Sequence, residues 1–271
     1  MLGTALVTHL RRHDLVLTDL AEMDITDHVA TRDVMQAARP EVVIHAAAMT
    51  AVDRCESEPD LAHRVNAIGS RNVALAAERA GAAIVYIGTD FIFDGGSRTP
   101  YREYDAPRPL SVYGASKLAG ELAVREHARR HYVVRTAWLY GAGGPNFVET
   151  ILRAARAGRP LRVVNDQEGA PTWTEDLAAA IAALIETELY GVYHVTNAGH
   201  CSWYQYALAI LSGAGLGAAA IEPVTTAEWG APAARPAYSV LANFAWAASG
   251  FAPLRPWPEA LAAYLLSRGA A

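Results

Sequence analysis

Two side chains suited to proton transfer, Tyr113 and Lys117, stand four positions apart in the string YGASK. On a helix, positions i and i+4 lie on one face, so the phenol and the ammonium can meet at one ligand. A nearby ammonium favours the phenolate and lowers the pKa of the phenol from its usual ~10. The spacing therefore predicts an acid–base pair. The alternative is a solvated lysine on a helix face.

Lys117 is the only lysine in the chain. The other 22 of the 23 lysine and arginine residues are arginines. Arginine cannot supply a compact point charge with a tunable pKa. A chain that otherwise uses arginine throughout is expected to keep one lysine where an ammonium is specifically needed.

Thr89 follows an apolar run, 83–87, which predicts a buried strand. In a parallel sheet the carboxyl end of a strand faces the ligand crevice. A hydroxyl at that end can polarise a substrate carbonyl beside Tyr113. A turn or a helix cap is the alternative interpretation of the string GTDF.

The elements that must position these residues alternate between strand and helix. Gly81 is the expected C-terminal end of the helix predicted at 58–80. Strands that are apolar throughout and separated by helices indicate a doubly wound α/β fold, with a parallel sheet covered on both faces. The predicted strands are 15–17, 42–44, 83–87 and 132–134, and the predicted helices are 28–38, 58–80 and 111–130.

Composition excludes several classes of protein. The 271 residues are 52% hydrophobic and 19% charged with a net charge of −5, so general nucleic-acid binding is not expected. The cysteines, Cys55 and Cys201, are far apart, which excludes a disulfide scaffold or a cysteine-rich zinc site and suits a reducing cytoplasm. No apolar run reaches the ~18 residues of a membrane span, so no membrane partner is expected.

Thr89, Tyr113 and Lys117, in this order, resemble the Ser/Thr–Tyr–Lys set of the extended short-chain dehydrogenase/reductases, which have a Rossmann-type fold. Longer strings narrow the resemblance to the dTDP-4-dehydrorhamnose reductase family, over essentially the whole chain. These strings are AAAMTAVDRCE, GTDFIFDG, PLSVYGASKLAGE, RTAWLYG, NDQEGAPT and ARPAYSVL.

The resemblance implies NAD(P)H-dependent reduction of the 4-keto group of dTDP-4-dehydro-L-rhamnose to dTDP-L-rhamnose. Tyr113 would protonate the incipient alkoxide, Lys117 would hold the nicotinamide ribose, and Thr89 would hydrogen-bond the carbonyl oxygen. Asp90 and Trp138 match positions that contact the sugar nucleotide, although core packing is the alternative for Trp138. NADPH is the expected cofactor, with NADH possible.

Further positions match the family's cofactor contacts. Asp19 could accept a hydrogen bond from a ribose hydroxyl, which would favour NADH, whereas nearby arginines could receive a 2′-phosphate. Asp24 and Ile25 match the adenine side, but the string DITD is equally typical of a helix start. The expected cofactor-binding residues are Leu2, Gly3, Asp19, Asp24, Ile25, Ala46, Ala48, Met49, Thr50, Tyr113 and Lys117.

The family begins with a strand and a GxxGxxG turn that sets the pyrophosphate on a helix N-terminus. Here Met1-Leu2-Gly3 matches only the end of that motif, with Gly3 as its last glycine. We expect the first strand and two glycines to be encoded upstream of Met1. Some members of the family are described with Mg²⁺, but no carboxylate cluster has readable metal spacing, so no metal site is predicted.

The domain prediction follows from a change in the sequence after about residue 141, beyond which loops and residues rich in Ala, Pro and Trp replace the regular alternation of strand and helix. Residues 1–141 are expected to form the dinucleotide-binding domain, with 173–195 returning to it, and 142–172 and 196–271 the smaller substrate-binding lobe. A homodimer is possible. Two alternatives stay open: a 4-ketoreductase or epimerase for another nucleotide deoxysugar, and a non-catalytic dinucleotide-binding regulatory homologue.

Overall fold

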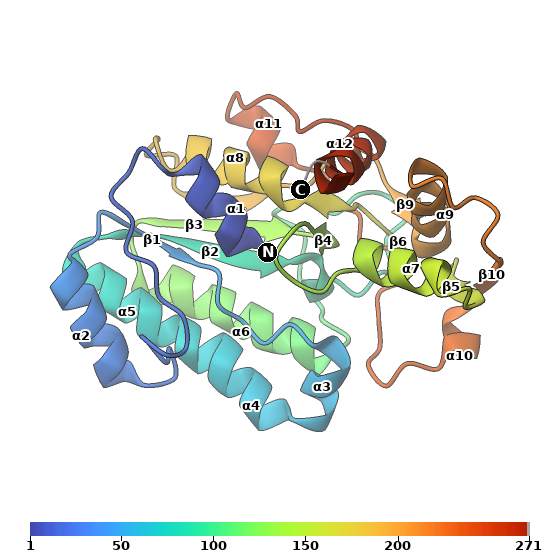
Figure 1. Ribbon diagram of the computed structural model, residues 1–271. Helices are drawn as coiled ribbons and strands as arrows, with labels where there is room; N and C mark the ends of the chain where they lie inside the picture. Colours follow the sequence, from blue (N-terminus) through green and yellow to red (C-terminus); the bar gives the residue numbers. More distant parts are fainter. Residues whose placement is uncertain (270–271) are drawn as a thin grey trace.

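A four-stranded parallel sheet forms the centre of the computed structural model, which describes residues 1–269 (Figure 1). Every pair of neighbouring strands in this sheet is parallel, which confirms the predicted doubly wound α/β class. The return of 191–195 to the sheet is also confirmed, because β8 pairs with β3. In spatial order the strands are β1 (Val42–His45), β2 (Ala83–Thr89), β3 (His131–Thr136) and β8 (Gly191–His194).

Helices cover both faces of this sheet (Figure 1). All seven residues of β2 are buried, because a strand with helices on both faces has no solvent side. One face carries α1 (Leu2–His9), α8 (Thr174–Leu184) and α11 (Phe244–Ala248). The other face carries α2 (His28–Ala38), α5 (Ser70–Ala80) and α6 (Val112–His127).

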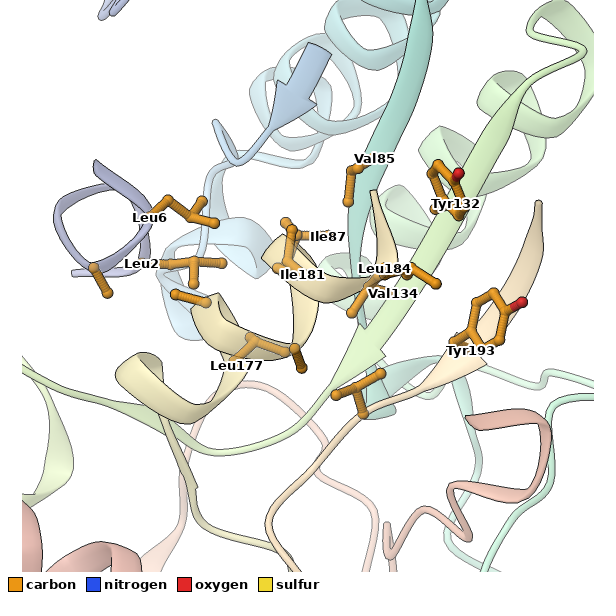
Figure 2. Packing of buried hydrophobic residues seen from close by; sticks show 14 of the residues in the cluster. Leu2, Leu6, Val85, Ile87, Tyr132, Val134, Leu177, Ile181, Leu184 and Tyr193 are labelled. Atoms are coloured by element: carbon orange, nitrogen blue, oxygen red, sulfur yellow. The ribbon is translucent and has the colours of Figure 1, made fainter. Parts of the chain in front are cut away.

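The core on the α1 and α8 face is built from side chains that alternate along the strands (Figure 2). Val85 and Ile87 of β2 and Val134 of β3 pack against Leu6 of α1 and Ile181 of α8. Residues between them, such as Tyr86 and Val133, belong to the core of the opposite face. Successive side chains along each strand thus point to opposite faces of the sheet and pack into two separate cores.

The predicted helix over 58–80 forms, and a stretch in its middle is π-helical instead of α-helical. A π-helical turn, Arg64–Gly69, joins α4 (Pro59–His63) to α5, and Gly81 ends α5 in the left-handed conformation with φ 71°. The short helix α3 (Val52–Ser57) precedes α4. No described helix is long and apolar enough to cross a membrane.

A smaller group of elements lies beside the carboxyl ends of the central strands (Figure 1). It has its own core of buried apolar and aromatic residues, which includes Tyr140, Leu152 and Tyr206. Its strands form three two-stranded sheets: β5 (Leu161–Val164) with β10 (Ile221–Val224), β4 (Leu139–Tyr140) with β7 (Thr172–Trp173), and β6 (Glu168–Gly169) with β9 (Cys201–Ser202). Its helices are α7 (Phe147–Arg156), α9 (Trp203–Gly213), α10 (Thr226–Trp229) and α12 (Trp257–Gly269).

The predicted strand at 15–17 does not form in this structure. Residues 14–19 have no regular structure, and Val16 and Leu17 are 66% and 65% exposed. A strand needs a neighbour to satisfy its backbone groups, and no described segment pairs with this one. β1 is accordingly only half-buried over Val42–Ile44.

A buried ion pair ties α6 to β3. The Arg135 guanidinium donates two hydrogen bonds to the Glu121 carboxylate, at 2.9 and 2.6 Å, and the two side chains are only 2% and 1% exposed. Arg135 also donates to the carbonyl of Glu103. The pair fixes the helix that carries Tyr113 and Lys117 to the sheet.

Glu121→Gln should lower the free energy of unfolding by about 3–5 kcal/mol, because it leaves the Arg135 charge buried without its partner. Urea denaturation of both proteins at neutral pH measures the difference. Glu126→Gln, on an exposed position of the same helix, is the matched control and should change stability by less than about 0.5 kcal/mol. Equal effects of the two variants would contradict this account of the pair.

Candidate active site

Thr89 and Asp90 stand at the carboxyl end of β2, where the predicted ligand crevice opens. Both are buried, and the Thr89 hydroxyl donates to Asp90 Oδ1 at 3.1 Å. Thr89 Oγ1 also accepts a hydrogen bond from the Phe91 N–H at 3.3 Å, which caps the 3₁₀ turn Asp90–Ile92. The Thr89 hydroxyl therefore does cap a helical turn, which was the alternative interpretation of the string GTDF. It also lies close to Tyr113.

The start of α6 is held very close to this strand end. Ser111 caps the helix by accepting from Gly114 N–H at 3.1 Å, and Glu56 accepts from Val112 N–H at 2.8 Å. A Cβ on Gly114 would lie 2.2 Å from the carbonyl oxygen of Phe91, so only glycine permits this approach. The neighbouring residue, Tyr113, is thereby brought against Thr89 and packs edge-on against the Phe91 ring.

Burial raises the pKa of Tyr113 to about 12. The neighbouring Thr89 hydroxyl opposes this shift, and the Asp90 carboxylate adds to it. The expected lowering of the Tyr113 pKa by Lys117 is therefore wrong for this structure, since desolvation of the phenolate outweighs any nearby cation. At neutral pH Tyr113 keeps its proton, which is the form a proton donor requires.

Lys117 is buried on the same side of α6, and its Nζ reaches the end of β2. It donates to the carbonyl of Ile87 at 2.7 Å and lies 4.3 Å from the centre of the Tyr86 ring. Burial lowers the pKa of Lys117 to about 7, and the Glu121 carboxylate opposes this shift. Being 4% exposed, the side chain is not a solvated lysine. Thr89, Tyr113 and Lys117 thus meet at one strand end.

Asp90 connects this strand end to the smaller lobe. Its Oδ2 accepts a hydrogen bond from the Ser239 hydroxyl at 2.5 Å, and Ser239 N–H donates to the carbonyl of Glu168 at 2.9 Å. Burial raises the pKa of Asp90 to about 6, although the bonds from Ser239 and Thr89 lower it. Ser239 lies in the string ARPAYSVL, but the sequence alone did not single it out.

Asn66 is a second residue that sequence reasoning missed. It is fully buried, and its side-chain amide accepts from Met49 N–H at 2.8 Å and donates to the Met49 carbonyl at 3.0 Å. The same amide donates to Ser116 on α6 at 3.0 Å. A polar residue on the inward side of the helix 58–80 was the available signal. Asn66 fixes the segment that follows β1 relative to the Tyr113 helix.

The segment after β1 leaves the strand end open to a ligand. Ala46 and Thr50 are exposed, and Ala48 and Met49 are half-buried. Small side chains here fit a dinucleotide lying over the strand end, since they leave its surface uncovered. Gly3, at the start of α1, likewise has no atom within 4 Å of where a Cβ would stand.

Other expected cofactor residues are placed differently. Leu2 is buried in the core under α1, so only its backbone is free to face a ligand. Asp19 is exposed in the irregular segment, where its Oδ1 accepts from Leu20 N–H at 2.8 Å, so it does not close a strand as expected. Asp24 is exposed and Ile25 is buried in the core.

The helix start predicted at 24–27 forms. Asp27 caps α2 by accepting from Val29 and Ala30 N–H groups, and Asp24 accepts from Thr26 N–H. An adenine contact by Asp24 and Ile25 stays a prediction.

Trp138 lies where the main chain leaves β3 for the smaller lobe. Its φ is +47°, a left-handed conformation that costs a non-glycine residue on the order of 1–3 kcal/mol. A Cβ on Gly169 would lie 2.3 Å from its indole ring, and the ring of Trp203 stacks on it. The ring is half-buried, so core packing accounts for only part of its surface.

No metal site is visible in residues 1–269, where no group of three or more His, Cys, Asp or Glu side chains could hold an ion. Both cysteines are free and buried.

The chain resembles known proteins over almost its whole length. The family model described as RmlD substrate binding domain matches residues 1–268. A spore coat polysaccharide biosynthesis protein, SpsK, from Bacillus subtilis is 43% identical over 100% of this chain and 95% of its own. A dTDP-4-dehydrorhamnose reductase from Streptomyces griseus is 44% identical over 96% of this chain and 88% of its own.

A solved structure has the same fold throughout. It is that of dTDP-4-dehydrorhamnose reductase from Bacillus anthracis in complex with NADP, with 43% identity and a TM-score of 0.96. The alignment covers 98% of this chain and 95% of that one.

Lys117→Met should remove a pH-dependent contribution to stability. The folded pKa of about 7 lies below the value of 10.5 for an ordinary lysine, so the unfolded chain binds the proton more readily. Stability from this group is therefore gained as pH rises from about 7 towards 10.5 and lost as pH falls. The wild-type protein should gain about 1.4 kcal/mol per pH unit over the variant in this window.

Urea denaturation at about pH 7 and about pH 9 tests this expectation. Glu126→Met, at an exposed position on the same helix, is the control and should leave the pH dependence between these two values unchanged. A difference between wild type and Lys117→Met that stays constant with pH would mean that Nζ titrates as a solvated amine.

Proposed function

The chain belongs to the RmlD substrate binding domain family, and on that premise we propose that it reduces the 4-keto group of dTDP-4-dehydro-L-rhamnose to give dTDP-L-rhamnose. It is an NAD(P)H-dependent oxidoreductase of dTDP-rhamnose biosynthesis. Relatives that carry the reductase name are similar over most of both chains, which supports the same activity here.

One observation carries the proposal: the phenol of Tyr113 is buried beside Thr89 at the carboxyl end of β2, and burial raises its pKa to about 12, so it keeps its proton at neutral pH. A ketone reduction needs a proton donor at the carbonyl oxygen as that oxygen gains charge. A neutral phenol beside a hydroxyl supplies this donor, whereas a phenolate could not. The regulatory alternative gives no reason for this arrangement.

In the proposed reaction the ketone gains one hydride and one proton. A bound NADPH supplies the hydride to C4 of the sugar. Tyr113 gives its proton to the carbonyl oxygen, and Thr89 orients that oxygen by hydrogen bonding. The Lys117 ammonium would stabilise the phenolate left on Tyr113 and would hold the nicotinamide ribose.

The proposed cofactor is NADPH. The NADP complex of the Bacillus anthracis structure supports this choice, and NADH stays the alternative because Asp19 is exposed near α1. The residues that would hold it are those whose surface is open, namely Gly3 and the segment Ala46–Thr50, together with the backbone of Leu2. A requirement for Mg²⁺ is not part of the proposal.

The proposed substrate contacts lie across from these residues. Asp90 and Trp138 would contact the sugar nucleotide, since both stand where β2 and β3 meet the smaller lobe. We accordingly propose the boundaries 1–141 with 173–195 for the dinucleotide-binding domain, and 142–172 with 196–271 for the substrate lobe. The free cysteines suit a cytoplasmic enzyme, and a homodimer is proposed as its assembly.

An assay of NADPH oxidation with dTDP-4-dehydro-L-rhamnose tests the proposal. Consumption of NADPH with formation of dTDP-L-rhamnose is the expected result. Turnover only with another 4-keto deoxysugar nucleotide would favour the related reductases. Tight NADPH binding without turnover of any such substrate would favour the regulatory alternative.

Tyr113→Phe should reduce kcat by roughly 10²- to 10⁴-fold, the usual share of a positioned proton donor. NADPH binding and the melting temperature should hardly change, because the ring is kept and only the hydroxyl is lost. Tyr104→Phe, at an exposed position, is the matched control. Retention of more than about half of the wild-type turnover would remove Tyr113 from the proton-transfer step.

A further inference from the structure

Trp203 forms the most intimate aromatic contact of the smaller lobe, with Trp138. The two ring centroids are 3.4 Å apart and the ring planes differ by only 5°. Phe147 packs against Trp203 from α7, with centroids 4.6 Å apart. The ring of Trp138 therefore packs against α9 directly through Trp203, and Trp203 in turn packs against α7 through Phe147.

The conformation of Trp138 depends on contacts from other segments. Its backbone is left-handed, with φ +47°, which its own residue type disfavours. Gly169 makes room for the ring on one side, because any Cβ there would overlap the indole. Trp203 covers the ring from α9.

The position of Trp203 is itself well fixed. It is the first residue of α9, and Ser202 and Gln205 form a reciprocal capping box at that end. The Ser202 hydroxyl also donates to Asn165 at 2.7 Å. Asn165 and Gly169 belong to the same string, NDQEGAPT, so one segment supports both sides of the indole.

The same segment leads directly to the candidate active site. Gly169 follows Glu168, whose carbonyl accepts from Ser239 N–H, and the Ser239 hydroxyl donates to Asp90. Contacts through Gly169, Glu168 and Ser239 therefore link Trp138 to Asp90 as one wall.

We propose that Trp203 is a positioning residue for the sugar nucleotide: by stacking on Trp138 it fixes where that indole ring stands beyond the end of β3. Trp203 acts through Trp138 and need not touch the ligand. The inference rests on the proposed function, since it assigns Trp138 to the wall that contacts a nucleoside diphosphate sugar. Its effect belongs to substrate binding and leaves the Tyr113 proton transfer unchanged.

Trp203→Leu removes the stacked ring, and Trp203→Phe keeps an aromatic face. With dTDP-4-dehydro-L-rhamnose, Trp203→Leu should raise KM about tenfold or more while kcat and the KM for NADPH change less than about twofold. Trp203→Phe should restore KM to within about threefold of wild type. Trp229→Leu, at an exposed tryptophan of α10, is the matched control.

Circular dichroism can detect the stacking of Trp138 and Trp203 in the absence of substrate. Near-ultraviolet circular dichroism is sensitive to how tryptophan rings are packed, so the signal should change in both Trp203 variants and much less in Trp229→Leu. A changed signal in Trp203→Leu with an unchanged KM for the sugar nucleotide would reduce Trp203 to core packing and overturn the inference.

Equilibrium binding of dTDP separates this inference from the proposed function. If the wild type binds dTDP but turns over no 4-keto sugar, the proposed function fails, while a weaker Kd for dTDP in Trp203→Leu still supports the positioning role. An unchanged Kd together with an unchanged KM overturns it. If Trp203→Leu does not fold, Trp203→Phe and Trp203→His decide the matter, since only the former should keep wild-type binding.

Discussion

The close approach of α6 to the end of β2 is the constraint on which the candidate site depends. Gly114 lets the helix backbone pass within contact distance of the Phe91 carbonyl, and Gly120 does the same at the carbonyl of Asn66, where a Cβ would lie 2.1 Å away. The buried Arg135–Glu121 pair ties the helix to β3. Tyr113 and Lys117 are fixed by these contacts before any ligand arrives, so little reorganisation is needed for proton transfer.

The close packing of α6 on the sheet also sets the pKa values of Tyr113 and Lys117. Packing α6 against the sheet excludes water from both side chains, and burial shifts their pKa values in opposite directions, up for the phenol and down for the ammonium. Their ordinary values are 10.0 and 10.5, so burial separates two groups that would otherwise titrate together. Tyr113 stays neutral around pH 7, while Lys117 stands near its midpoint. A phenolate formed beside Lys117 would favour the charged ammonium, which couples the two groups during turnover.

Sequence patterns predicted the strands that pair in the central sheet and failed at the run with which no described strand pairs. The run 83–87 and the return of 191–195 form strands in the sheet because both have paired strands beside them. The run at 15–17 is similarly apolar, but no strand within residues 1–269 pairs with it, and it remains irregular. Local composition thus sets a propensity, and pairing decides whether a strand forms.

The candidate site shows the same division between local and non-local information. Tyr113, Lys117 and Thr89 could be selected from residue type and spacing, since helix and strand periods place them at one strand end. Asn66, Ser239 and Trp203 could not, because each acts through a partner remote in sequence: Asn66 on Met49, Ser239 on Asp90, and Trp203 on Trp138. The direction of the Tyr113 pKa shift was missed for a related reason, since the spacing of two residues contains no information about how much water the fold removes.

One of the contacts that were missed, that of Ser239, also joins the two halves of the molecule. Ser239 reaches Asp90 from the smaller lobe, and Arg235, four residues earlier, forms an ion pair with Asp53 of α3 at 2.9 Å. The segment 235–239 therefore crosses from one half to the other at the same place where Thr89 and Tyr113 meet. A ligand held between the halves would contact residues that these bonds already restrain. The strained backbone of Trp138 stands at this junction as well, where packing from both halves can offset its cost. The chemistry of the site is thus set by helix-to-sheet packing, and its substrate side by the contacts between the lobes.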